Sequence, residues 1–418
     1  MHPTKRICGV ESSTLEGKTI VFGVTGSIAA VRCVELARSL VRRGASVIPV
    51  MSDAATRILH PDAMHYACGE KVVTTITGGV EHVDYCGVDG MCDLLLVAPA
   101  TANTLSKIAC GIDDTPVTTF ATTAIGSGKP VLVVPAMHEA MYEHRAVVDN
   151  IERLREMGVF FVEPVIEEGA AKIAEGEDVM LEVERILGSQ SLRGNKILIT
   201  SGATSERIDP IRIITNRASG RTGIELALEA YRRGASVTIV HTARGNLHGI
   251  PDQRSGRPQA SEKLDDVREI MVESGAEMTR AVLREAAHAD VLISAAAISD
   301  FTVDGVADTK IRSDAAQTLI LQPMPKLLER VRTEYPHLMI IGFKAETNVS
   351  QQELIARARE SMDRYGLAAV IANDVGQGGI GEETNQIHIV QRESISSFSD
   401  KKDKLARHII NTVEEILN

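Results

Sequence analysis

Tryptophan is absent from this chain of 418 residues, and aromatic residues make up only 3% of it. Binding to nucleic acid relies on clustered Lys and Arg and on aromatic stacking, whereas the net charge here is −11. We therefore expect no nucleic-acid partner. No apolar run approaches the ~18 residues that cross a bilayer, so we expect no membrane partner either.

Cysteine is scarce and unevenly placed, because all six cysteines lie within the first 110 residues. No two of them have the spacing of a metal-binding pair, and they do not suggest a disulfide ladder. We expect reduced thiols and no metal held by protein ligands alone. The first 17 residues lack the apolar core of a secretory signal, so a cytoplasmic location is expected.

Two segments of the first half recur in the second half. Residues 15–23 (LEGKTIVFG) are similar to 192–200 (LRGNKILIT), and each is a polar lead into a short apolar run. Residues 42–47 (RRGASV) recur as 232–237, where two arginines suit the end of a helix and the glycine suits the position after it. A β-branched run follows in both places. Each half is therefore predicted to begin with a β-α-β unit.

A third repeat indicates the fold class. Residues 92–100 and 289–297 are apolar runs too continuous for strands with one exposed face, and such runs are typical of parallel sheets covered on both faces. The predicted class is α/β, with two doubly wound, mostly parallel Rossmann-like sheets. We expect one domain at 1–188, with its core starting near 17, and a second at 189–418. Ligands should bind at the carboxyl ends of the strands.

The loop after the first predicted strand contains a glycine turn and a hydroxyl, at Gly26 and Ser27. Backbone amides and the Ser27 hydroxyl could hold a phosphate where the next helix begins. A turn that serves only chain reversal would have the same sequence, and the third glycine of the dinucleotide fingerprint is absent. This segment alone leaves both interpretations open.

Loops further along the first half carry a family resemblance. Residues 98–104 (APATANT) and 134–142 (VPAMHEAMY) each follow an apolar run, and 78–82 (GGVEH) precedes them. Together they resemble the homo-oligomeric flavin-containing cysteine decarboxylases, over about residues 17–187. The resemblance implies FMN bound in the crevice of the sheet. It also implies that the flavin oxidises the substrate thiol, assists loss of the adjacent carboxylate and then returns the electrons.

The resemblance assigns roles to single residues. The FMN site is expected at Gly26, Ser27, Ser52 and Thr101, and the catalytic and substrate positions are His82, Asn103, Met137 and His138. His82 matches the catalytic histidine, and Asn103 matches an asparagine that shapes the flavin and substrate site. Without the resemblance, His82 would be interpreted as a surface histidine of a flexible loop.

The first half departs from the family at two points. The family motif is approximately Pro-x-Met-Asn-x-x-Met, and His138 replaces its asparagine. The lid cysteine of bacterial members, a proposed proton donor, has no equivalent near 168–173, since no cysteine follows Cys110. We hypothesise that His138 or Lys172 contributes the proton instead.

Basic and glycine residues are concentrated near the start of the second half. Arg212, Asn216, Arg217 and Arg221 lie within ten residues, and guanidinium groups fit carboxylates and phosphates. Gly220 suits a polar turn at the start of a helix, where an anion could bind. A simple helix cap is the alternative.

Several loops of the second half resemble one family in the correct order. They are residues 199–223, 294–301 (SAAAISDF), 308–311 (DTKI), 341–347 (IGFKAET) and 372–375 (ANDV). They look like phosphopantothenate-cysteine ligase over residues 192–418. That family activates the 4′-phosphopantothenate carboxylate with a nucleotide and releases pyrophosphate. The amine of cysteine then displaces the nucleoside monophosphate.

Roles follow from this second resemblance as well. Asn216 matches the asparagine at the acyl-nucleotide intermediate, Arg212 matches a substrate-site arginine, and Lys310 matches the lysine that meets the triphosphate and the transition-state charge. The nucleotide is expected at Ser294, Ala295, Ala296, Asp300, Lys310 and Phe343. Without the resemblance, Lys310 would be interpreted as a solvated lysine of a loop. Two later family lysines are not clearly present, and the corresponding helix offers Arg357, Arg359 and Arg364.

Decarboxylase followed by ligase is the order of the bifunctional coenzyme A biosynthesis enzymes, and the details above resemble archaeal members most. Such members favour CTP, with ATP as the alternative co-substrate, and Mg²⁺ is expected with the nucleotide. The implied small molecules are 4′-phosphopantothenate and cysteine. Decarboxylase domains of this kind form trimers with the flavin between neighbours, and ligase domains form dimers, so a homo-oligomer is expected.

Two other functions remain open from the sequence. An NAD-dependent dehydrogenase with duplicated Rossmann domains would use Asp53 to bind a ribose, although the short glycine loop is unfavourable. The first half could instead be a flavin-binding module without catalysis. The presence of His82 and Asn103 is unfavourable to that interpretation, whereas the altered His138 is compatible with it.

Overall fold

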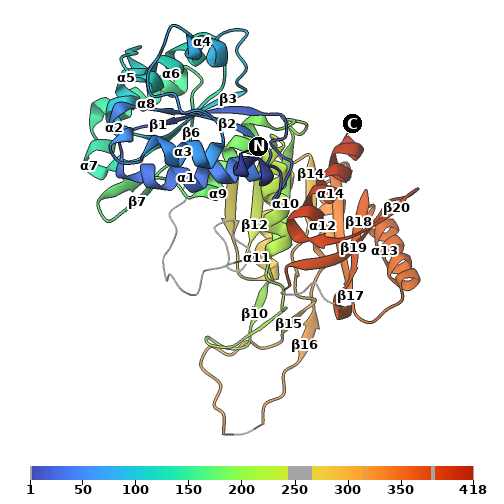
Figure 1. Ribbon diagram of the computed structural model, residues 1–418. Coiled ribbons are helices and arrows are strands. Elements are labelled where there is room, and N and C mark those ends of the chain that lie inside the picture. Colours follow the sequence, from blue (N-terminus) through green and yellow to red (C-terminus); the bar gives the residue numbers. More distant parts are fainter. Residues whose placement is uncertain (1, 243–265, 315, 378–381, 418) are drawn as a thin grey trace. The chain divides into compact units, whose positions relative to one another are not determined.

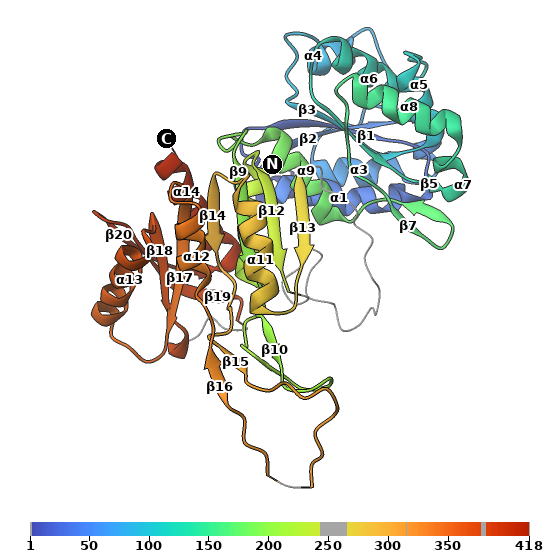
Figure 2. The same ribbon diagram turned by 180° about the vertical axis from the view of Figure 1, so that it is seen from behind.

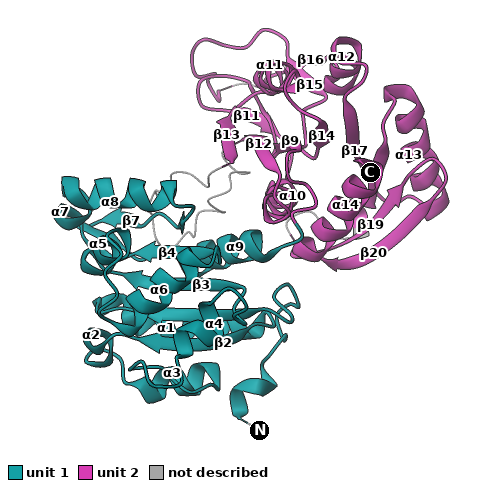
Figure 3. Cartoon of the chain, turned by 90° about the horizontal axis from the view of Figure 1, so that it is seen from above, with its two compact units in different colours: residues 1–189, 259–262 teal, residues 190–258, 263–418 magenta. Residues whose placement is uncertain are grey.

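The structure is a computed structural model that describes residues 2–242, 266–314, 316–377 and 382–417. The chain forms two compact units, shown in different colours in Figure 3. Of the described residues, the first unit comprises 2–189, and the second comprises those from 190 onward. Each unit is described by itself below.

The first unit contains a parallel five-stranded sheet with the order β2-β1-β3-β4-β6. Its strands are β1 Thr19–Val24, β2 Ser46–Met51, β3 Leu94–Ala100, β4 Val131–Pro135 and β6 Phe160–Phe161. All seven residues of β3 are buried, as the continuous apolar run predicts. The strand order reverses between β1 and β3, which is the position where a ligand crevice forms in such sheets.

Helices cover both faces of this sheet (Figure 1). One core cluster packs beneath α1 Cys33–Arg42, α3 Pro61–Cys68 and α9 Gly176–Leu187. The other packs beneath α4 Glu81–Cys86, α5 Ala102–Ala109, α6 Pro116–Gly126 and α8 Arg145–Glu156. The shorter elements are η1 Pro3–Arg6, η2 Ile28–Arg32, α2 Asp53–Thr56, α7 Glu139–Tyr142, β5 Met137–His138, β7 Val165–Glu167 and β8 Ala170–Lys172.

The second unit contains an eight-stranded sheet with the order β13-β12-β9-β14-β17-β18-β19-β20. Its parallel strands are β9 Lys196–Ser201, β12 Ser236–His241, β13 Val267–Met271, β14 Val291–Ser294, β17 Met339–Glu346 and β18 Ala369–Asp374. The antiparallel strands are β19 Thr384–Val390 and β20 Ile395–Lys401. The strand order reverses between β9 and β14.

Helices also cover both faces of the second sheet (Figure 2). One face packs against α11 Gly275–Ala286, α12 Leu327–Glu334 and α13 Gln351–Tyr365, whose apolar residues share a core cluster. The other packs against α10 Arg221–Arg232 and α14 Lys402–Leu417. Two hairpins extend the unit: β10 Ser205–Arg207 with β11 Ile213–Thr215, and β15 Phe301–Val303 with β16 Leu321–Pro323. A 3-10 turn, η3 Val375–Gln377, follows β18.

The repeats in the sequence correspond to matching structure in both units. Gly44 and Gly234, with φ of 101° and 91°, follow α1 and α10 and turn the chain into β2 and β12. Asp93 and Asp290 each accept a bond from the first residue of the opening strand, with Oδ2 at 2.8 Å and 2.7 Å. The predicted α/β class with two doubly wound, mostly parallel sheets is confirmed.

Candidate functional sites

Three loops of the first unit meet at the carboxyl ends of β1, β2 and β3. A Cβ added to Gly26 would lie 2.5 Å from the Cβ of Ala54, so this glycine lets the β1 loop contact the start of α2. The buried Thr25 hydroxyl donates to the Pro99 carbonyl (2.6 Å) and accepts from the Thr101 amide (3.2 Å). Gly26, Ser52 and Thr101 are therefore brought to one edge of the sheet.

Three hydroxyls at this edge, those of Ser27, Ser52 and Thr101, accept hydrogen bonds from backbone amides at the starts of helical segments. Ser27 accepts from the Ala29 amide at the start of η2, so the segment begins with a 3-10 turn before α1. Ser52 and Thr101 accept similarly at the starts of α2 and α5. A hydroxyl that accepts from a backbone N–H can still donate its own proton. These groups can therefore bind an anion that needs neutral donors.

The loop after β4 reaches the same edge. The Ala136 amide donates to the Ala100 carbonyl at 3.0 Å, and Met137 and His138 follow directly. Met137 is half-buried, whereas His138 is exposed and pairs with Ala170 on β8. The β7–β8 hairpin, which includes Lys172 and contains no cysteine, therefore lies beside His138.

His82 and Asn103 have different surroundings. Asn103 is exposed in the first turn of α5, two residues after Thr101. His82 lies on α4, where its ring packs edge-on against the buried Phe120 of α6. The Nδ1 atom of His82 is buried and has no hydrogen-bond partner among the residues that the structure describes. The ring contact of His82 is thus with α6.

The second unit contains a cavity of about 530 Å³ at the carboxyl side of β14 and beside β17. Four of the residues expected to hold the nucleotide line it: Ser294, Ala296, Asp300 and Phe343. Ala295, between two of them, and Lys310 are not among the lining residues. The cavity combines an aromatic side chain and aliphatic groups with polar atoms, as nucleotide sites do.

The cavity has a rim of cations, each held by a carboxylate. Lys326 is bonded to Asp300, Arg357 lies 2.5 Å from Glu346, and Arg364 lies 2.6 Å from Glu329. Lys344 is also at the rim, 3.1 Å from Glu346. Of the three helical arginines considered from sequence, Arg357 and Arg364 line this cavity and Arg359 does not. The charged rim suits a polyanion that could displace some of these carboxylates.

The catalytic candidates of the second unit form two groups. Asn216 donates from Nδ2 to the Ala297 carbonyl at 3.1 Å, which places it beside the loop that lines the cavity. Arg212 donates to the buried Asp209 at 2.6 Å and to the Ile311 carbonyl at 3.0 Å, next to Lys310. Arg212 and Lys310 therefore lie on neighbouring segments, apart from the lining of the cavity.

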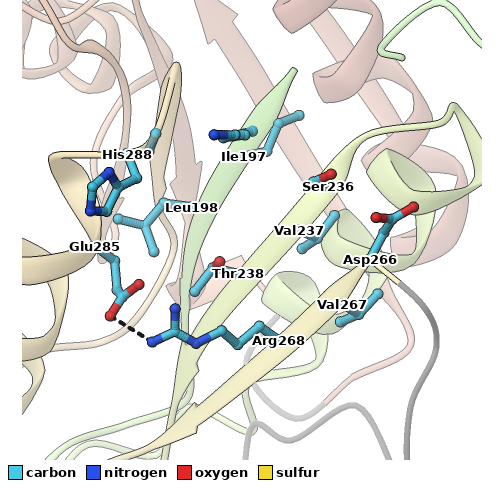
Figure 4. Close-up of a pocket in the computed structure, with 12 residues that line it drawn as sticks. Ile197, Leu198, Ser236, Val237, Thr238, Asp266, Val267, Arg268, Glu285 and His288 are labelled. Atoms are coloured by element: carbon cyan, nitrogen blue, oxygen red, sulfur yellow. Dashed lines mark hydrogen bonds and ion pairs between the residues drawn. The ribbon is translucent and has the colours of Figure 1, made fainter. Parts of the chain in front are cut away.

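A second cavity, of about 430 Å³, lies at the opposite edge of the same sheet (Figure 4). It is lined by Lys196, Ser236 and Val267, the first residues of β9, β12 and β13. Arg268 points across it to Glu285 at 2.9 Å. None of the predicted site residues lines this cavity, and in doubly wound folds chemistry occurs at the carboxyl edge, so we do not assign it to the reaction.

Sequence reasoning missed three polar residues that organise these sites: Thr25, Asp209 and Lys326. Thr25 joins the ends of β1 and β3, and Lys326 holds the Asp300 carboxylate. Each of the three bonds a residue more than 20 positions away in the chain. Asp209 also makes local bonds within its own turn. Asp209 lies within a loop that carries the family resemblance and Thr25 precedes the glycine turn, whereas Lys326 lies in no such motif, and the partners of all three are not visible in the sequence.

Comparison with known proteins identifies the family. Residues 9–188 match the family described as Flavoprotein, and residues 192–417 match the DNA/pantothenate metabolism flavoprotein C-terminal domain. The chain is 45% identical over 421 residues to the coenzyme A biosynthesis bifunctional protein CoaBC of Thermococcus kodakarensis, with 100% of both chains covered. The chain belongs to this bifunctional family. This membership decides against the dehydrogenase alternative.

A second full-length relative agrees with this membership, and one solved structure is similar to the first half of the chain. CoaBC of Methanocaldococcus jannaschii is 36% identical over 419 residues, with 100% of this chain and 98% of that protein covered. The solved structure of the FMN-dependent cysteine decarboxylase SpaF is 30% identical, with a TM-score of 0.35, and covers 40% of this chain and 94% of its own. None of the helices in the described part of the chain has the length and apolar character needed to span a bilayer.

Proposed function

We propose that the chain makes 4′-phosphopantetheine in two steps. The second unit, as a ligase domain over 189–418, joins 4′-phosphopantothenate to cysteine at the expense of CTP. The first unit, as a decarboxylase domain over 1–188, removes the cysteine carboxylate with FMN. The observation that carries the proposal is full-length similarity to CoaBC proteins combined with polar groups gathered at both carboxyl edges.

The ligase step requires a better leaving group than a carboxylate oxygen. The substrate carboxylate attacks the α-phosphorus of the nucleotide, so a mixed anhydride forms and pyrophosphate leaves. Lys310, as a mobile point cation, would stabilise the charge that develops on the phosphates. The amine of cysteine then attacks the acyl carbon, and the nucleoside monophosphate leaves. Asn216 would hold the acyl-nucleotide, and Arg212 would bind the substrate.

The nucleotide is proposed to bind in the cavity of about 530 Å³ beside Ser294, Ala296 and Phe343. The cationic rim with Arg357 and Arg364 favours a polyphosphate over an uncharged ligand. Ala295 is proposed to contribute its backbone. CTP is preferred here, with ATP as the alternative, and Mg²⁺ would arrive with the triphosphate, since such complexes keep few direct protein ligands.

The first unit has donors that fit an FMN phosphate. Gly26 leaves room for a close backbone approach, and Ser27, Ser52 and Thr101 provide hydroxyl protons. When bound, the flavin supplies reversible oxidation of the substrate thiol, which makes loss of the neighbouring carboxylate feasible. The residues of the chain would orient the substrate and move protons. Asn103 and Met137 would shape the substrate pocket.

His138 is the better of the two candidates for the final proton donor. Lys172 donates to Glu168 at 2.6 Å and to Glu167 at 3.2 Å, and these bonds raise the pKa of its ammonium group. A raised pKa makes Lys172 a weaker acid, so its proton is less available at neutral pH. His138 is exposed beside the same hairpin, and an imidazole is the side chain that most often transfers protons in enzymes.

We further propose that the active assembly is a homo-oligomer in the cytoplasm, with trimeric decarboxylase and dimeric ligase contacts. The contacts of His82 with α6 are compatible with a flavin site that a neighbouring copy completes. The unpaired Nδ1 of His82 would then find its partner in the assembled site.

The direct test is incubation of the full chain with 4′-phosphopantothenate, cysteine, Mg²⁺ and either CTP or ATP. Mass analysis should find 4′-phosphopantetheine, carbon dioxide and one pyrophosphate per turnover, with CTP giving the faster reaction. If neither nucleotide gives the acylated cysteine, the ligase proposal fails. If the acylated cysteine forms but retains its carboxylate with FMN bound, the first unit is a non-catalytic flavin module.

A further inference from the structure

Asp209 is a buried carboxylate that accepts four hydrogen bonds, and it is only 1% exposed. Its Oδ1 accepts from the amides of Ile211 and Arg212, both at 2.8 Å. Its Oδ2 accepts from the Arg212 guanidinium at 2.6 Å and from the Ile311 amide at 3.1 Å. The groups that donate to Asp209 belong either to its own turn or to Ile311, which is about a hundred residues further along the chain.

The bond to Ile311 distinguishes Asp209 from an ordinary turn residue. An Asp in a turn needs only the local amides, which are those of Ile211 and Arg212 here. The Ile311 amide donates to Asp209, and the Ile311 carbonyl accepts from Arg212, so this backbone unit is held on both sides. The Ala307 amide donates to the Ile208 carbonyl at 3.0 Å. The segment that carries Lys310 is thus fastened on both sides of this lysine.

Hydrogen bonds hold the backbone around Lys310, but among the described residues none holds its side chain. It is exposed, and no ion pair or hydrogen bond to another described residue holds its ammonium group. The fastened backbone and the free ammonium group together allow Lys310 to reach an anion from a defined origin.

We propose that Asp209 is a positioning residue of the ligase, which fastens the Lys310 segment to the Arg212 turn and so fixes the point from which Lys310 reaches the reacting phosphates. The proposal rests on the ligase function proposed above. Asp209 itself touches neither substrate nor nucleotide in this account, and it acts on the reaction through the position of Lys310.

The charge state of Asp209 supports this geometry. Burial raises the pKa of its carboxyl group, but the bonds from Ile211, Arg212 and Ile311 outweigh burial and lower that pKa to about 2. The carboxylate therefore stays ionised at neutral pH and can accept all four bonds. An amide at this position would replace one acceptor oxygen with an NH₂ group, which faces other donors.

Glu206 provides a matched control in the neighbouring strand of the same hairpin. It is also a buried carboxylate, and it accepts from the Gly275 amide at 2.9 Å and from the Thr302 hydroxyl at 3.4 Å. These bonds join β10 to α11 and β15 and do not involve the segment of Lys310. Glu206→Gln thus makes the same chemical change in the same hairpin without releasing that segment.

The test compares Asp209→Asn, Glu206→Gln, Lys310→Gln and the Asp209→Asn/Lys310→Gln double variant in the full chain. Pyrophosphate release with 4′-phosphopantothenate, cysteine, Mg²⁺ and CTP gives kcat and KM separately. We expect Asp209→Asn to lower kcat about 10- to 100-fold with little change in KM for CTP, because misplacement by about 1 Å has that scale of effect. Glu206→Gln should stay within about threefold of wild type.

The double variant shows whether Asp209 acts through Lys310. Once Lys310 is lost, its position no longer matters, so the double variant should be no more than about threefold slower than Lys310→Gln alone. Multiplied effects would overturn the proposal. So would a normal kcat for Asp209→Asn while Lys310→Gln is impaired, and that result would leave the ligase function intact. A wild-type chain that releases no pyrophosphate, or a fully active Lys310→Gln, would instead refute the proposed function.

A second readout does not depend on activity. Trypsin cleaves after lysine, and the bonds at Ala307 and Ile311 should protect the Lys310–Ile311 bond. Asp209→Asn should speed this cleavage about tenfold or more, as followed by the masses of the fragments. If Asp209→Asn does not fold, Asp209→Ser serves, since its shorter side chain can still accept in the turn but loses reach to Ile311. Unchanged cleavage in the folded variant would overturn the proposal.

Discussion

The carboxyl edges of the two sheets differ in the chemistry of the groups they present. In the first unit the groups are neutral hydroxyls such as those of Ser52 and Thr101, which already cap helices. In the second unit they are cations such as Arg357 and Arg364, each paired with a carboxylate. Similar β-α-β beginnings therefore present different chemical groups, because the loops and not the strands determine the charge at each edge.

This contrast agrees with the ligands proposed for each unit. A cofactor that stays bound needs one phosphate held by preorganised neutral donors. A triphosphate that must be cleaved and released needs mobile positive charge during the reaction. The ion pairs at the rim of the second site hold these cations, and the proposed nucleotide would compete for them.

The largest effect is expected from His82→Asn, which separates the functions of the two units. Decarboxylation of supplied 4′-phosphopantothenoylcysteine should fall by about 10²- to 10⁴-fold, since a positioned proton-transfer group contributes on that scale. Pyrophosphate release by the ligase should stay unchanged. His60→Asn is the control, because His60 is exposed and caps α3, where asparagine caps equally well. Equal loss in both variants would disprove the role of His82.

A smaller effect, on flavin content, is expected from a change at Gly26 in the loop after β1. Gly26→Val should reduce the flavin bound per chain several-fold, because its Cβ would meet Ala54 at 2.5 Å in the cluster of hydroxyls. Absorbance of the purified protein near 450 nm measures this. Gly126→Ala is the control, since nothing lies within 4 Å of the added Cβ. Full flavin content in Gly26→Val would show that the phosphate binds elsewhere.

The smallest effect is expected on the stability of each unit when an equivalent helix-capping residue is replaced. Thr115 and Ser274 each form a capping box, at α6 and α11, and replacing either with alanine should cost about 1 kcal/mol. All the cysteines belong to the first unit, so labelling of the buried Cys33 and Cys86 reports unfolding of that unit. Thr115→Ala should speed their labelling about fivefold, and Ser274→Ala should not. Equal acceleration by both would show that the units unfold together.

The fold was largely predictable because its signals are local. The apolar runs of β3 and β14 and the arginine-glycine ends of α1 and α10 each lie within ten residues. The site was predictable only as a list of loops. That Asp300 bonds Lys326, or that Asp209 accepts from Ile311, depends on pairings that the sequence does not contain. The position of His82 against Phe120 also follows only from packing.

The central claim is that one chain carries two separate active sites, and mixing two variants tests it most directly. His82→Asn and Lys310→Gln are incubated singly and in equal amounts with 4′-phosphopantothenate, cysteine, CTP and Mg²⁺. The account predicts that His82→Asn alone accumulates 4′-phosphopantothenoylcysteine, that Lys310→Gln alone yields almost no product, and that the mixture makes 4′-phosphopantetheine. If each single variant loses both reactions and the mixture stays inactive, the two sites are not separate.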